Sequence, residues 1–214
     1  VDFVLPFRFS EGAWQLGTRG PISLRIAEVV NQVTVKNIAA DLQGAYPWSE
    51  NNPLLLSDVS ADLLGGKIIM QQLRMPQHDP ALLRVQNISS SELISAVNPK
   101  QFAMSGPVSG ALPLWLDNEK WIIKDGWLTN PGPMTLRIDK DTADAVVKDN
   151  MAAGAAINWL RYMEISHSWT KINLDNLGVL TMQSTVTGNS RVDGKVGTVN
   201  LNYTHEENVF TLWR

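Results

Sequence analysis

Apolar and polar residues alternate with a period of two along most of the chain. Near the N-terminus, Ile22, Leu24 and Ile26 alternate with Ser23 and Arg25. Such alternation indicates a β-strand with one apolar face and one face in water. The same pattern recurs over residues 33–36, 112–116, 134–138, 172–174, 180–186 and 199–203. Because Gly, Asn, Asp and Pro separate these segments at hairpin distances, the pattern predicts a mostly β fold of sequential antiparallel strands.

Three of the predicted strands share a short repeat. Residues 35–42 (VKNIAADL) resemble residues 56–63 (LSDVSADL), and residues 85–93 (VQNISSSEL) form a looser third copy. Each copy has an Asn or Asp two positions after an apolar residue, and two small residues follow the next apolar position. These residue types favour a bend or bulge inside a strand. The repeat therefore predicts a repetitive, stacked sheet rather than a compact enzyme fold.

One segment breaks the period of two. It covers residues 139–164 and reads DKDTADAVVKDNMAAGAAINWLRYME. Asp141 is a candidate N-cap, and acidic residues in the first turns suit the helix dipole. The later half is apolar almost all round, which is typical of a helix buried on more than one side. We predict a helix at about 141–164 that caps or plugs the end of the sheet. Residues 82–93 leave two alternatives open, a second short helix or a turn.

Composition narrows the classes of function. The 214 residues carry a net charge of -3, only 18% are charged, and cysteine is absent. The acidic balance gives no basic patch for nucleic acid, and the lack of cysteine excludes disulfides and thiolate metal sites. The most apolar run, residues 151–160, is far shorter than the ~20 residues of a membrane-spanning helix. Since the chain opens in mid-pattern, we expect it to be a fragment of a longer protein.

Two glycine-containing motifs imitate catalytic loops. Gly106-Pro-Val-Ser-Gly110 places its serine one position late for a nucleophile elbow, and a strand pattern follows where a helix is required. Gly65-Gly66-Lys67 lacks the upstream glycine and the Ser or Thr of a phosphate-binding loop. We therefore interpret Gly106 and Gly110 as strand bends, and Lys67 as the residue after a hairpin turn.

Metal-binding and catalytic patterns are also incomplete. His78, His167 and His205 are isolated in the sequence. The acidic residues Asp139, Asp141 and Asp144 lack the spacing of a calcium-binding loop and its closing glutamate. We predict no metal, no cofactor and no catalytic residues. An enzyme, such as a hydrolase, would need Ser, His and carboxylate groups that only the fold could bring together. The eight tryptophans leave two readings, packing in the core and rim or aromatic anchors at an apolar groove.

Three blocks in the second half of the chain carry a family resemblance. They are residues 109–128 (SGALPLWLDNEKWIIKDGWL), 157–165 (INWLRYMEI) and 193–214 (DGKVGTVNLNYTHEENVFTLWR). The first block holds a Gly-x-Leu-Pro-Leu strand from Gly110 to Leu114 and an Asp-Gly pair at Asp125 and Gly126. The chain resembles the AsmA-like bacterial envelope proteins, and specifically the C-terminal region of their YdbH-like members. The aromatic at Trp159 and the turn at residues 130–133 depart from the pattern.

The resemblance implies a fold and a function. The fold would be an elongated, curved antiparallel sheet folded into a taco-like groove, with residues 1–214 as one domain of a longer chain. The longer protein would be periplasmic, anchored in the inner membrane by an N-terminal segment, with this end near the outer membrane. It would conduct phospholipids between the two membranes, keep outer-membrane lipid in balance, and receive a small outer-membrane lipoprotein of the YnbE kind by strand addition.

The alternating apolar residues are the candidate lipid-binding set under this interpretation, because they share strand parity. Moving one acyl CH₂ from water onto an apolar wall gains ~0.8 kcal/mol, so a continuous apolar face suits a lipid path. The alternative is a structural or interaction module whose apolar face is a closed core that docks the lipoprotein. The candidate lipid-binding residues are Leu112, Leu114, Leu116, Leu136, Ile138, Ile172, Leu174, Leu180, Met182, Val199 and Leu201. The candidate partner-binding residues are Val196, Val199, Leu201 and Tyr203.

Overall fold

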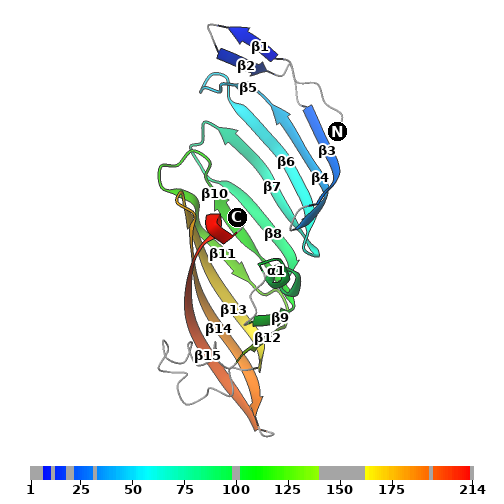
Figure 1. Cartoon of the computed structure of the whole chain (residues 1–214), viewed down its shortest axis with the longest axis vertical. Helices are drawn as coiled ribbons and strands as arrows, with labels where there is room; N and C mark the ends of the chain where they lie inside the picture. The colour runs from blue at the N-terminus through cyan, green and yellow to red at the C-terminus, as the bar shows by residue number, and fades with distance from the viewer. Residues whose placement is uncertain are drawn as a thin grey trace.

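The computed structural model describes residues 7–10, 13–17, 22–30, 33–97, 102–139, 162–192 and 195–212. Most of them lie in one large antiparallel sheet (Figure 1). Its strands are β3 (Ile22–Val30), β4 (Thr34–Gln43), β6 (Leu54–Leu63), β7 (Gly66–Met75), β8 (Ala81–Ser89), β9 (Phe102–Ser105), β10 (Pro107–Leu114), β11 (Trp121–Thr129), β12 (Met134–Ile138), β13 (Tyr162–Asp175), β14 (Val179–Val192) and β15 (Lys195–Asn208). A small sheet holds β1 (Phe7–Ser10), β2 (Ala13–Gly17) and β5 (Ala45–Tyr46), and the described helices are α1 (Ser90–Val97) and α4 (Val209–Leu212).

The main path through the sheet follows the chain, in the order β15-β14-β13-β11-β10-β8-β7-β6-β4-β3. Each strand on this path pairs antiparallel with the next strand of the path along the chain, as the period-two pattern predicts. Among the described strands, β3 and β15 form the two edges and do not pair with each other. Figure 1 shows the strands succeeding one another along the long axis while the sheet curves and twists. The prediction of a mostly β fold with an elongated, curved antiparallel sheet is confirmed, and the sheet is open.

Two pairs of short strands continue each other along the same line of the sheet. β9 and β10 are separated only by Gly106, whose φ of 110° is a conformation that glycine adopts readily. β9 pairs with β12, and β10 pairs with β11. Residues 130–133 form an insertion between β11 and β12 rather than a hairpin turn. Buried Asn130 closes it, because its Oδ1 accepts the Ser168 N–H at 2.6 Å and its Nδ2 donates to the Gly132 carbonyl at 2.8 Å.

The predicted bends occur at the Asn or Asp of each repeat. Asn37, Asp58 and Asn87 have φ angles of 51°, 50° and 51°, and Asp125 has a φ of 59°. Asn and Asp adopt this left-handed conformation more readily than other residues with a side chain. The first two bulges are reciprocal, since residues 37–38 lie opposite one residue of β6 and residues 58–59 lie opposite one residue of β4. The repeat thus encodes β-bulges, which increase the local bend and twist of a sheet.

The predicted helix at 141–164 is wrong at its C-terminal end. Tyr162, Met163 and Glu164 are the first residues of β13, and residues 140–161 lie outside the described part. Met163 and Ile165 are buried while Tyr162 and Glu164 are exposed, so a period of two had already begun there.

Of residues 82–93, the first eight belong to β8, and α1 begins at Ser90. The Oγ of Ser89 accepts the N–H of Glu92 at 3.3 Å, as in a helix N-cap.

The buried apolar residues gather in two clusters. One cluster joins β12, β13 and β15, and the other joins β7 and β8. Partly buried side chains from the neighbouring strands pack against both of them. The first cluster contains Met134, Leu136, Ile138, Met163, Ile165, Val199 and Leu201. The second contains Met70, Leu73, Met75 and Ala81.

Candidate functional site

Strand register places one continuous set of apolar side chains on the same face of the sheet. Directly opposed residues of an antiparallel pair share a face, and so do alternate residues along a strand. Leu83 opposes Leu112, Leu114 opposes Ile123, and Ile123 opposes Leu174, which carries the face across four strands. We call this surface the apolar face. Its members from β4 to β8 are Val35, Ile38, Ala40, Leu42, Leu54, Leu56, Val59, Ala61, Leu63, Ile68, Met70, Leu73, Met75, Ala81, Leu83, Val85 and Ile88.

The predicted lipid-binding residues fall into two groups on this face. The first group remains half-buried and consists of Leu112, Leu114, Leu174, Leu180 and Met182. The second is buried and consists of Leu136, Ile138, Ile172, Val199 and Leu201. Their shared face follows from the pairs Ile172 with Met182 and Leu174 with Leu180. Register thus assembles these residues, while contact with lipid remains a prediction.

Leu116 is the exception to this set. β10 ends at Leu114, and Leu116 lies in the turn before β11 with 57% of its surface exposed. Its backbone N–H donates to Gln77 Oε1 at 2.7 Å, so the chain has left the strand conformation that alternation assumes. The placement of Leu116 on the same strand face was therefore wrong.

The bulges explain why sequence reading missed much of the apolar face. Each bulge inserts one residue, which reverses the parity of every position after it. In β4, Val35 and Ile38 share the apolar face although they are three residues apart, because Asn37 lies between them in the left-handed conformation. The repeat contains the signal that was missed, since its Asn or Asp marks the bulge in each of β4, β6 and β8. Counting one extra residue at each of these positions assigns the later residues to the correct face.

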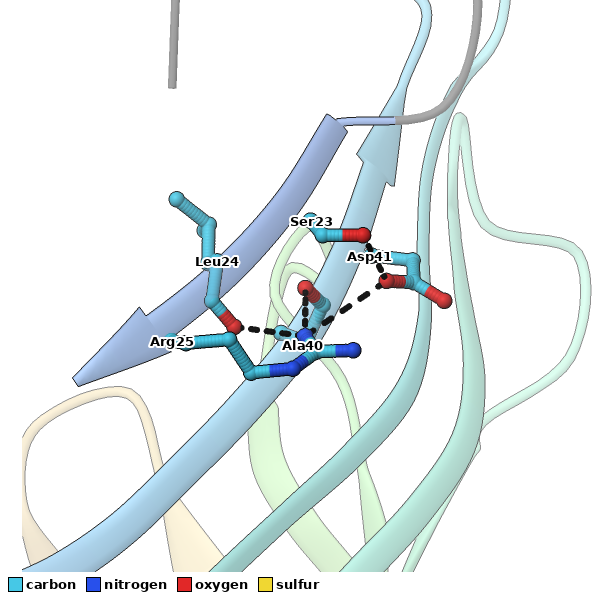
Figure 2. A network of polar contacts seen from close by, with 5 residues as sticks. All are labelled: Ser23, Leu24, Arg25, Ala40 and Asp41. Atoms are coloured by element: carbon cyan, nitrogen blue, oxygen red, sulfur yellow. Dashed lines mark hydrogen bonds and ion pairs between the residues drawn. The ribbon is translucent and has the colours of Figure 1, made fainter. Parts of the chain in front are cut away.

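The opposite face, which we call the polar face, carries charged and hydrogen-bonding side chains. Figure 2 shows a network on β3 and β4 in which Arg25 Nη1 donates to the carbonyls of Leu24 at 2.7 Å and Ala40 at 3.2 Å. The Asp41 carboxylate lies 3.6 Å from the same nitrogen and accepts the Ser23 hydroxyl at 3.2 Å. Charge on an edge strand such as β3 discourages unwanted strand pairing.

Hydrogen bonds connect neighbouring turns along one rim of the sheet. Gln77, in the turn after β7, reaches across to the turn after β10. Its Nε2 donates to the Leu114 carbonyl at 3.1 Å, and its backbone N–H donates to Asp117 Oδ2 at 3.1 Å. Asn176, in the turn after β13, donates through Nδ2 to the Asn118 carbonyl at 2.7 Å. Residues 117–120 thus form the tip of the hairpin between β10 and β11, and they connect it to the turns on either side.

The predicted partner-binding residues lie on β15, an edge strand. Val199 and Leu201 are buried in the cluster on the apolar face, and half-buried Tyr203 packs against it. Val196 is 61% exposed and lies on the polar face, so it does not join the other three. Among the described strands, β15 pairs with β14 alone.

Ionisable groups offer no assembled metal centre within the described residues. No group of three or more His, Asp or Glu side chains stands close enough there to hold a metal ion. His78 Nε2 lies 2.7 Å from Glu50 Oε1, and His205 Nε2 lies 3.0 Å from Glu207 Oε2. In the same described part, every helix is too short or too polar to cross a membrane.

Comparison with known proteins decides the family. The family described as "YdbH-like: Intermembrane phospholipid transport protein YdbH" matches residues 1–214. The chain belongs to the YdbH-like family. It is 80% identical, over all 214 residues, to the "Probable phospholipid transport protein YdbH" of Escherichia coli (strain K12). The match spans 24% of the length of that relative. No solved structure matches the chain.

Membership of the YdbH-like family confirms the resemblance inferred from the three sequence blocks. The name of this relative describes transport of phospholipid and no chemical reaction. This agrees with the prediction that the chain is not an enzyme.

Proposed function

We propose that residues 1–214 form one groove domain of a longer protein and conduct phospholipid along the apolar face. The observation that carries this proposal is the continuity of that face across the sheet, with Leu112, Leu114, Leu174, Leu180 and Met182 only half-buried. Each acyl CH₂ that leaves water for such a surface gains ~0.8 kcal/mol. A row of similar apolar sites holds a chain without fixing it at one position, so the lipid can slide.

The alternative is a structural or interaction module with a closed apolar core. The buried cluster around Met163 favours it locally, because that residue is 0% exposed. The half-buried residues of β10, β13 and β14 favour an open path over the rest of the face.

Native mass spectrometry of the purified chain distinguishes the two functions. A groove should retain phospholipid through gentle purification, and mild detergent should remove it with a matching loss of mass. A chain that carries no lipid after extraction from membranes, and takes none from vesicles, would favour the closed core.

We also propose that the longer protein lies in the periplasm, anchored in the inner membrane, with β15 toward the outer membrane. There, a small outer-membrane lipoprotein of the YnbE kind would add a strand to β15. An edge strand exposes backbone groups that another chain can pair with. β15 is 14 residues long and lies at one end of the main strand order. It therefore offers a long template for strand addition. Lipid could then pass toward the outer membrane without leaving an apolar surface.

The absence of cysteine allows a direct test of strand addition. Thr204 is exposed on the polar face of β15, and Ala27 is exposed on the opposite edge strand, β3. We expect Thr204→Cys to form a disulfide with a single cysteine at the lipoprotein position directly opposite it, and not with cysteines at the two adjacent positions, because adjacent side chains point to the other face. Disulfides that form with Ala27→Cys instead, or at every lipoprotein position equally, would contradict addition at β15.

A further inference from the structure

The last strand of the sheet changes the chemistry of the apolar face. Val199 and Leu201 are followed, on the same face, by Tyr203, His205 and Glu207. The Tyr203 hydroxyl lies 3.4 Å from His205 Nδ1, and His205 Nε2 lies 3.0 Å from Glu207 Oε2. The His205 and Glu207 side chains are 39% and 40% exposed, so a ligand on this face can reach both of them.

Two cross-strand rows lead from apolar residues to this polar pair. Leu174 opposes Leu180, which opposes Glu207, and Ile172 opposes Met182, which opposes His205. From β4 to β14, the described positions of the apolar face hold no ionisable side chain. An amphiphile with its chains over these rows therefore meets its first ionisable groups at the edge strand.

The contacts of His205 suit one arrangement of donors and acceptors. With the hydrogen of the neutral imidazole on Nε2, His205 donates to the Glu207 carboxylate, and Nδ1 accepts the Tyr203 hydroxyl. The Glu207 carboxylate has acceptor capacity beyond the single bond from His205. A cationic N–H donor is the complementary ligand, because hydrogen bonds between two charged groups are the strongest of this kind.

We propose that Glu207, oriented by His205, binds the primary ammonium headgroup of a phospholipid such as phosphatidylethanolamine. This inference rests on the proposed function, because the acyl chains would lie on the rows that end at Leu180 and Met182. The site selects against anionic headgroups, which Glu207 repels, and against quaternary ammonium headgroups, which lack N–H donors. The edge strand would thereby orient a lipid with its headgroup at the end of the apolar path.

The test is lipid capture from mixed vesicles by the purified chain. Vesicles would contain equal parts of phosphatidylethanolamine and phosphatidylglycerol with the same acyl chains, and bound lipids would be quantified by mass spectrometry. The wild-type chain should enrich phosphatidylethanolamine. Glu207→Gln should lower the bound ratio about tenfold, the effect of losing one charged hydrogen bond. The matched control is Glu206→Gln, because Glu206 is exposed on the polar face of the same strand.

The outcomes separate this inference from the proposed function. Capture of lipid without enrichment, or an equal effect of both substitutions, would overturn the headgroup site and leave lipid conduction intact. A chain that captures no lipid would overturn both. Should Glu207→Gln fail to fold, the wild-type chain still tests the site, since replacing phosphatidylethanolamine by phosphatidylcholine should reduce capture to the level of phosphatidylglycerol. Displacement of the lipid by equimolar soluble phosphoethanolamine would show that the free headgroup is the ligand, and would overturn the lipid assignment.

Discussion

Asn and Asp residues with a left-handed backbone determine the local shape of this sheet. A residue with a Cβ in this conformation is strained by about 1–2 kcal/mol, and short polar side chains reduce that strain by bonding locally. Asn37 also makes a cross-strand bond, since its Nδ2 donates to Asp62 Oδ2 on β6 at 2.8 Å. The same conformation recurs at Asp58, Asn87 and Asp125, so the bends repeat along the sheet.

Replacing Asp58 by valine should destabilise the fold by about 1–2 kcal/mol, because a β-branched residue does not tolerate its φ of 50°. Asp58→Gly should be close to neutral, since glycine adopts this conformation without a steric penalty. Urea unfolding monitored by circular dichroism measures both. Gln72→Val, at an exposed position of β7, is the control. Equal losses for the valine and glycine variants of Asp58 would mean that its side chain, and not its backbone, matters.

At the scale of elements, side chains in the turns hold neighbouring hairpins together. Gln77 donates to Leu114 and accepts from Leu116, so the turn after β7 is joined to the turn after β10 across β8. Sequence reading did not single out Gln77, because its partners are 37 and 39 residues away. A lone polar residue in a turn gives no local signal of such a contact.

Gln77→Ala should therefore lower the free energy of unfolding by about 1–2 kcal/mol, the effect of two lost hydrogen bonds whose partners are left unpaired. Chemical denaturation provides the measurement, and Gln72→Ala, on the exposed face of β7, provides the matched control. Hydrogen exchange should quicken at the Leu116 amide, which donates to Gln77. An unchanged exchange rate there would argue against the connection between the turns.

At the scale of the whole molecule, the sequence predicted the sheet better than its faces. Antiparallel order, the hairpin at Gly65-Gly66 and the bends in the repeats follow from local chemistry, which neighbouring residues encode. The start of β13 at Tyr162 and the exposed position of Leu116 were not predicted. Both depend on where a strand begins or ends, and a local pattern of apolar and polar residues defines such boundaries poorly. The closing of the insertion by Asn130 depends on Ser168, 38 residues later.

The whole-molecule account requires that lipid touches one face of the sheet and not the other. Met182 and Gln183 test this most directly, since they are adjacent on β14 and lie on the apolar and polar faces respectively. A photoreactive amino acid placed at each position of the full-length protein in cells reports what lies against it. The account predicts crosslinked phospholipid at position 182 and none above background at position 183. Equal capture at both positions, or capture at position 183 alone, would contradict a lipid path along the apolar face.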